Sequence, residues 1–94
     1  MDLEKLRIEI DKVDEDIVRL LKRRFEFTKL VGILKAETGV SSLSPKRESE
    51  QFKKFQTLSK ELDLPYPMVE KIFQTIRDQV LENHQKIKEG HESK

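Results

Sequence analysis

Apolar residues recur along the first third of the chain in alternating steps of three and four. The stripe consists of Leu3, Leu6, Ile10, Val13, Ile17, Leu20, Phe27, Val31 and Leu34. Heptad spacing of this kind places all members along one side of an α-helix. One position of the pattern, between Leu20 and Phe27, is occupied by Arg24. The spacing predicts a single helix of more than about thirty residues, far longer than the usual helix of a globular protein.

Polar residues mark the ends of this helix and the start of a second. Asp2 is suited to cap the first helix, and Gly39, within the break at residues 38–43, is suited to end it. Ser44 and Pro45 then have the character of an N-cap and a first helical residue. A helix of about four turns is predicted from the spacing of Phe52, Phe55, Leu58 and Leu62.

A second break and a third helix complete the chain. Residues 63–67 read Asp-Leu-Pro-Tyr-Pro, which predicts a stiff turn because prolines are excluded from helix interiors. The third helix is predicted from near Pro67 to Gly90 by the spacing of Val69, Ile72, Phe73, Ile76, Val80 and Ile87. No segment has the alternation of a strand. We therefore predict an all-α fold of three helices in one domain over residues 1–90, with residues 91–94 as a frayed tail.

So long a helix in a chain of 94 residues has no partner within its own protomer that could cover it. A second copy would supply one, so we expect an intertwined helical homodimer. Nineteen basic and eighteen acidic residues give a net charge of +1. No overall field would then attract nucleic acid or a membrane surface, and an anion site would have to be built locally. The absence of cysteine and the charged N-terminal segment favour a cytoplasmic protein without a signal peptide or membrane span.

Several cations stand out from the solvated charges. Arg24 interrupts the apolar stripe of residues 3–34. Either its aliphatic stem packs while its guanidinium reaches water, or it belongs to an anion site. Lys35 is eleven residues from Arg24, about 16 Å along one helix, so the two side chains could hold a small dianion between them. Arg7 is seventeen residues from Arg24, about 25 Å away. Only an antiparallel partner helix would bring its own Arg7 to the same ligand.

Other polar residues are less informative singly. Arg47 and Glu48 open the second helix, where the helix N-terminus attracts anions, although a glutamate there is also common. His84 lies with Val80 on the apolar face of the third helix, where a lone histidine is usually a packed residue. No residues have the spacing of a metal site, a phosphate loop or a catalytic nucleophile. An enzyme built on this chain would use neither metal nor covalent chemistry.

The spacing Arg-x16-Arg-x10-Lys-x11-Arg-Glu closely resembles that of the all-helical (AroQ-class) chorismate mutases. Leu6, Ile10, Asp14, Gly32 and the run Ile72-Phe73-Gln74 add to a resemblance that covers about residues 3–88. It implies a dimer with two sites, each completed by the long helix of the other chain. It also implies the cofactor-free rearrangement of chorismate, a dicarboxylate, to prephenate in aromatic amino acid biosynthesis.

The resemblance assigns roles to five residues of this chain. Arg7 of the partner subunit and Arg24 would hold the two carboxylates, with Arg47 supporting the pocket. Lys35 would face the ether oxygen, and Glu48 would bind the substrate hydroxyl. These roles suit the chemistry, because a pericyclic step needs a compressed substrate and stabilisation of charge on the ether oxygen.

Three matching positions depart from the family pattern. Ser44 stands where an aspartate commonly assists Glu48, and Val80 stands where a serine often donates to a carboxylate. His84 stands where an amide or a carboxylic acid donates to the ether oxygen. Its ring N–H could replace that donor, or the ring could pack at the pocket rim. These departures leave open an isochorismate pyruvate-lyase on the same scaffold, or a helical dimerisation or regulatory module with a weakened site.

Overall fold

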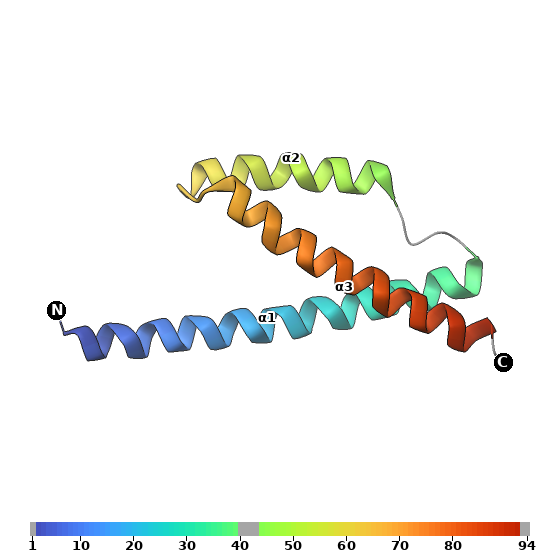
Figure 1. The fold of residues 1–94 in the computed structure, drawn as a ribbon, viewed down its shortest axis with the longest axis horizontal. Helices are drawn as coiled ribbons and strands as arrows, with labels where there is room; N and C mark the ends of the chain where they lie inside the picture. The colour runs from blue at the N-terminus through green and yellow to red at the C-terminus, as the bar shows by residue number, and fades with distance from the viewer. Residues whose placement is uncertain (1, 40–43, 93–94) are drawn as a thin grey trace.

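Three α-helices make up the computed structural model, which describes residues 2–39 and 44–92 (Figure 1). α1 runs over Leu3–Thr38, α2 over Pro45–Glu61 and α3 over Tyr66–Glu92. The described residues contain no strand, so the predicted all-α class and the long first helix are confirmed. The predicted break between the first two helices falls mainly on residues 40–43, which lie outside the described residues.

The observed helix ends follow from local hydrogen bonding and backbone conformation. Asp2 caps α1, because its Oδ1 accepts a hydrogen bond of 2.9 Å from the backbone N–H of Glu4. Gly39 ends α1 in the left-handed conformation, with φ 73°. Ser44 is the N-cap of α2 and Pro45 its first residue, but the Ser44 side chain makes no capping hydrogen bond. The predicted starts and stops of this half of the chain are confirmed.

α3 begins close to its predicted start and runs beyond its predicted end. It begins at Tyr66, where the backbone N–H groups of Met68 and Val69 donate to the Pro65 carbonyl at 3.2 and 3.3 Å. At the other end, the prediction that the helix stops at Gly90 is wrong, because α3 continues to Glu92. A glycine costs a helix interior only about 1 kcal/mol, and it ends a helix only when it turns left-handed. Among the described residues, Gly39 is the glycine with positive φ.

α3 lies against both other helices and holds the protomer together (Figure 1). The less exposed side of α1 is not the apolar stripe of residues 3–34, called the α1 seam below, but a neighbouring stripe consisting of Leu21, Phe25, Thr28, Gly32 and Ala36. Within it, Thr28 and Gly32 meet His84 of α3. α2 joins α3 through stacked rings of Phe55 and Phe73, whose centroids are 4.1 Å apart. Ile76, 8% exposed, lies on the inner side of α3.

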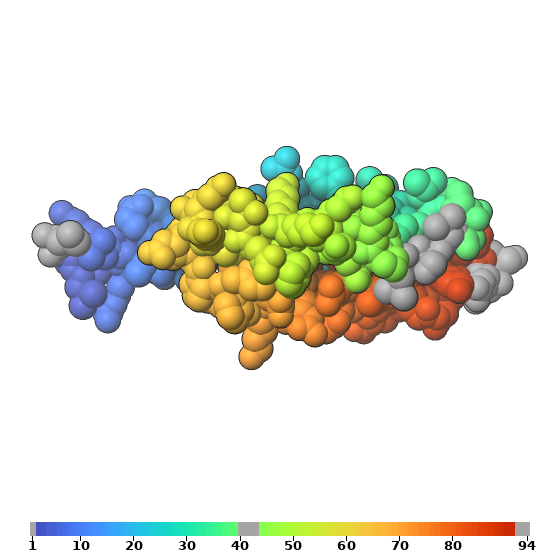
Figure 2. All heavy atoms as spheres, turned by 90° about the horizontal axis from the view of Figure 1, so that it is seen from above, coloured from blue at the N-terminus to red at the C-terminus, as the bar shows by residue number. Residues whose placement is uncertain are grey.

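The α1 seam is uncovered in the protomer. Its nine apolar residues retain between 42% and 61% of their surface, values typical of outward-facing side chains. Figure 2 shows the N-terminal part of α1 projecting beyond α2 and α3. The protomer is accordingly elongated, measuring 58 × 27 × 15 Å. A soluble monomer rarely leaves so continuous an apolar surface exposed.

Candidate active site

A cavity of about 1010 Å³ lies between the C-terminal half of α1, the first turns of α2 and the inner face of α3. Seven of the eight residues predicted from the sequence line it: Arg24, Lys35, Ser44, Arg47, Glu48, Val80 and His84. The eighth, Arg7, is exposed on the projecting part of α1 and is not part of this lining. The structure thus brings together residues that are up to sixty positions apart in the sequence.

Arg24 is partly buried at the inner side of the cavity. Its Nη1 is enclosed and, among the described residues, has no hydrogen-bond partner. Its Cζ lies 6.0 Å from the centre of the Phe73 ring, within the range of a cation–π contact. Burial, and then the nearby charge of Arg47, lower the pKa of Arg24, although a guanidinium remains charged at all ordinary pH values. An enclosed cation without an acceptor is suited to bind an anion.

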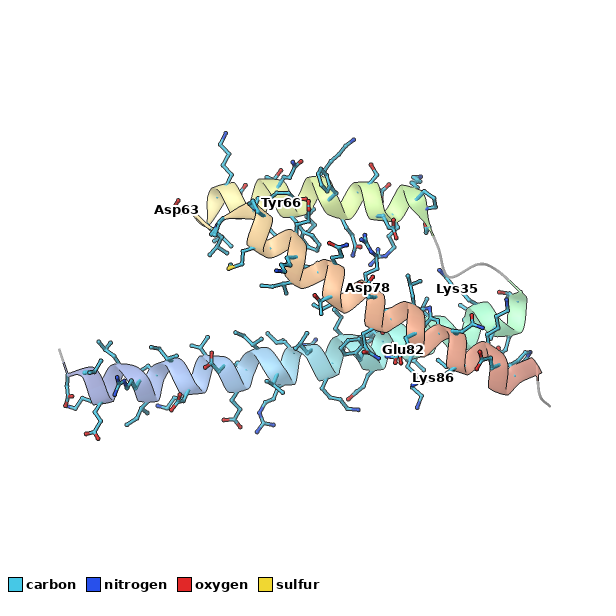
Figure 3. All side chains as sticks on the ribbon, in the orientation of Figure 1. Lys35, Asp63, Tyr66, Asp78, Glu82 and Lys86 are labelled. Atoms are coloured by element: carbon cyan, nitrogen blue, oxygen red, sulfur yellow. The ribbon has the colours of Figure 1, made fainter. Side chains whose placement is uncertain are left out.

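Cations outnumber carboxylates around the cavity. Its lining contains four Lys or Arg side chains and two carboxylates, an excess of two positive charges: Arg24, Lys35, Arg47, Arg77, Glu48 and Glu70. Figure 3 shows Lys35 and Tyr66 on different helices toward opposite ends of this region. The start of α2 adds the partial positive charge of a helix N-terminus. The lining therefore favours a small ligand that carries two negative charges.

Aromatic and aliphatic side chains form the remaining walls. Phe52 and Tyr66 meet edge to face, with ring centroids 5.4 Å apart, and both line the cavity. Burial and a hydrogen bond to the Glu70 carboxylate raise the pKa of Tyr66 to about 12. The phenol therefore stays neutral and acts as a donor at physiological pH. Apolar walls with a few placed charges are typical of small-molecule sites.

His84 occupies the crossing of α1 and α3. Its Nε2 lies 2.7 Å from the Thr28 carbonyl oxygen, and since a carbonyl only accepts, this nitrogen carries the hydrogen. The residue is only 6% exposed. The ring fits against Gly32, where an added Cβ would lie 2.6 Å from His84 Cδ2. A residue without a side chain is thus required beneath the ring.

The sequence profile of the family described as Chorismate mutase type II matches residues 6–85. The chain belongs to the chorismate mutase type II family. Over 61 residues it is 41% identical to a bifunctional chorismate mutase/prephenate dehydratase of Aquifex aeolicus (strain VF5). That match covers 65% of this chain and 17% of the relative's length. The predicted family and enzyme class are confirmed, and the chain spans a small part of this longer relative.

Within this chorismate mutase domain, sequence reasoning missed several cavity residues. Arg77, Glu70 and Tyr66 line the cavity from α3 but were not predicted as site residues. A signal for Arg77 existed, because it lies three positions before Val80 and seven before His84, on the same helical face. No comparable signal identified Thr28, whose contribution is a backbone carbonyl.

Neither a metal-binding cluster nor a membrane-spanning helix is found in the part of this chorismate mutase domain that the structure describes. Residues 2–39 and 44–92 contain no group of three or more His, Asp or Glu side chains arranged to hold a metal ion. None of the three helices has the length and apolar character needed to cross a membrane. The clustered charges of the cavity are the distinctive chemistry of these residues.

Proposed function

We propose that this domain converts chorismate to prephenate without a cofactor. The observation that carries the proposal is the enclosed Nη1 of Arg24, which has no acceptor among the described residues and lies in a cavity with excess positive charge. The reaction is intramolecular, since the ether C–O bond breaks as a new C–C bond forms in the same molecule. It needs a compact substrate conformer and stabilised charge on the ether oxygen, and fixed cations supply both.

Each residue predicted from the sequence that lines the cavity has a proposed task. Arg24, supported by Arg47, holds one carboxylate through charge-assisted hydrogen bonds. Lys35 stabilises the negative charge that develops on the ether oxygen. Glu48 accepts a hydrogen bond from the substrate hydroxyl. Ser44, whose hydroxyl makes no capping bond, and Val80 border the ligand.

A second copy of the chain completes the proposed site. The α1 seam is exposed along its whole length, and its burial in a homodimer would remove a large apolar surface from water. Arg7 lies about 25 Å from Arg24 along α1, so it serves the ligand of the other protomer. We therefore place Arg7 of the partner subunit at the second carboxylate.

For His84 the hydrogen bond to Thr28 supports a packing task. A neutral imidazole has one N–H, so as a donor to the ether oxygen a neutral His84 would have to give up the 2.7 Å bond that its Nε2 makes with Thr28. As a packed residue it keeps this bond and sets the distance between α1 and α3. His84→Ala separates the two tasks, because loss of a preorganised donor slows the reaction about a hundredfold. For a packed residue, as proposed here, the rate falls less than about threefold at temperatures where the variant is folded.

The activity is tested with purified protein and chorismate. We expect loss of chorismate absorbance and formation of prephenate by wild type, and a loss of a hundredfold or more in Arg24→Ala, on the order expected for a preorganised charge. Arg23→Ala is the matched control, because Arg23 is the exposed neighbour of Arg24 and lies outside the cavity. Release of pyruvate from isochorismate would instead support a lyase. No turnover of either compound would support a regulatory module and refute the proposal.

The shared site is tested by mixing two inactive variants. Arg7→Ala and Arg24→Ala homodimers each lack a group in both sites. A heterodimer has one site with both arginines and one with neither, so refolding an equal mixture should restore about a quarter of wild-type activity. Heterodimers that form without any recovery would contradict the placement of Arg7 in the partner's site.

A further inference from the structure

Arg77 is a cavity cation to which neither the sequence pattern nor the proposed roles above assign a task. It projects from α3 toward α2, and its Nη1 lies 3.9 Å from Oε1 of Glu48. Three other ion pairs among the described residues join neighbours three or four positions apart on one helix. The pair of Arg77 and Glu48 instead links two helices across the cavity rim.

The ion pair of Arg77 and Glu48 contributes little to folding stability. The side chains of Arg77 and Glu48 are 47% and 40% exposed, and ion pairs in such surroundings contribute little to folding stability. The stacked rings of Phe55 and Phe73 already hold α2 against α3. The position of the pair, rather than its strength, distinguishes it, because both residues line the cavity.

We infer that Arg77 is a positioning residue that holds the Glu48 carboxylate ready to accept the ligand's hydroxyl. The inference rests on the proposed function, in which Glu48 binds that hydroxyl. A glutamate side chain has several rotatable bonds, and holding it in the binding conformation reduces the entropy lost when a ligand arrives. A carboxylate has two oxygens, so Oε1 can face Arg77 while Oε2 accepts from the ligand.

The surroundings of Glu48 explain why a second helix supplies this support. Ser44, one turn earlier on α2, is neutral and contributes only its backbone carbonyl, which accepts from the Glu48 N–H at 3.0 Å. The other charged groups of the lining are Arg24, Lys35, Arg47 and Glu70. Of the three arginines in the lining, Arg77 is the one that lies within 4.0 Å of the Glu48 carboxylate, at 3.9 Å. Arg77 is therefore the arginine best placed to orient this carboxylate.

The test is a double-mutant cycle on the full chain with chorismate as the probe. Arg77→Gln should raise KM two- to fivefold, as expected for a partly exposed charge pair, and change kcat less than about twofold. In a Glu48→Gln background the same substitution should have no further effect, because its target is gone. Arg77→Lys should keep most of the affinity. Lys86→Gln is the matched control, since Lys86 pairs with Glu82 on the exposed surface of α3 outside the cavity (Figure 3).

The outcomes separate this inference from the proposed function. An equal rise in KM in both backgrounds would show that Arg77 contacts the ligand directly, which overturns a positioning task. If the wild-type enzyme is active and Arg77→Gln leaves KM unchanged, the pair of Arg77 and Glu48 is only a solvated surface contact. That result would overturn this inference but not the proposed function. A wild-type protein that consumes no chorismate would overturn the proposed function together with this inference.

Discussion

Gly32→Ala is expected to destabilise the protein, although glycine to alanine within a helix usually has the opposite effect. In an open helical position alanine stabilises by about 1 kcal/mol relative to glycine. At residue 32 the new Cβ would lie 2.6 Å from Cδ2 and 3.0 Å from Nε2 of His84, and 3.0 Å from Cδ1 of Ile87. Normal carbon contacts are about 3.5–4.0 Å, so the His84 ring would have to move by about 1 Å.

The size of the effect follows from what that movement costs. Overpacking of this kind costs about 1–3 kcal/mol, and loss of the hydrogen bond from His84 to Thr28 adds about 1 kcal/mol. After subtraction of the gain in helix propensity, we expect Gly32→Ala to lower the free energy of unfolding by about 2 kcal/mol. Removing the ring should relieve the clash, so the same substitution in a His84→Ala background should cost much less.

Urea unfolding followed by far-ultraviolet circular dichroism measures these differences at one fixed protein concentration. Gly90→Ala is the matched control, because Gly90 is also helical and a Cβ there meets nothing within 4 Å. It should stabilise by up to about 1 kcal/mol. If Gly32→Ala stabilised the protein as Gly90→Ala does, the close packing of His84 over α1 would be refuted.

Three further outcomes are expected. Because Tyr66 is the single tyrosine, its ionisation can be followed directly by phenolate absorbance. The absorbance should appear near pH 12 in the folded protein and near pH 10 in denaturant. A midpoint near pH 10 in the folded protein would contradict the burial of Tyr66 beside Glu70. Because the folded pKa is the higher one, its contribution to stability is present below pH 10 and is lost as pH rises from 10 to 12. Gly39→Ala should cost about 1 kcal/mol in urea unfolding because φ is 73° with open space around it; an unchanged midpoint would contradict a left-handed residue there. If the α1 seam is buried in a dimer, the urea midpoint should rise with protein concentration, whereas a constant midpoint over a hundredfold range would contradict the dimer.

The helices could be predicted from sequence because their signals are local. The α1 seam, the Asp2 cap and the left-handed Gly39 all act within a few residues, and all three are found in the structure. The predicted helix end at Gly90 was wrong because the sequence alone does not reveal whether a glycine adopts the left-handed conformation. The stripe of α1 that meets α3 was also missed. Thr28 and Gly32 interrupt the apolar character of this stripe. Their contribution to packing depends on α3, which crosses α1 at these residues.

In the candidate site, too, local signals could be predicted from the sequence and tertiary contacts could not. Arg24 could be selected because a cation in an apolar seam contradicts the pattern around it, and the structure gives it an enclosed nitrogen. Arg77 does not contradict the pattern around it, because a charged residue on an amphipathic helix is ordinary. Its approach to Glu48 depends on the turn between α2 and α3. The contact of His84 with Thr28 joins residues fifty-six positions apart, a distance that no periodicity bridges.

The unbroken length of α1 has a consequence for how this chain can vary. Arg24 and Lys35 reach one cavity because eleven helical steps separate them with no loop between. Each inserted or deleted residue in that stretch would rotate the second cation by about 100° and shift it by about 1.5 Å relative to the first. Substitutions there alter one side chain at a time, but a change of length would misplace everything beyond it. Over residues 24–35 we therefore expect related sequences to tolerate exchanges of residue type and to lack gaps.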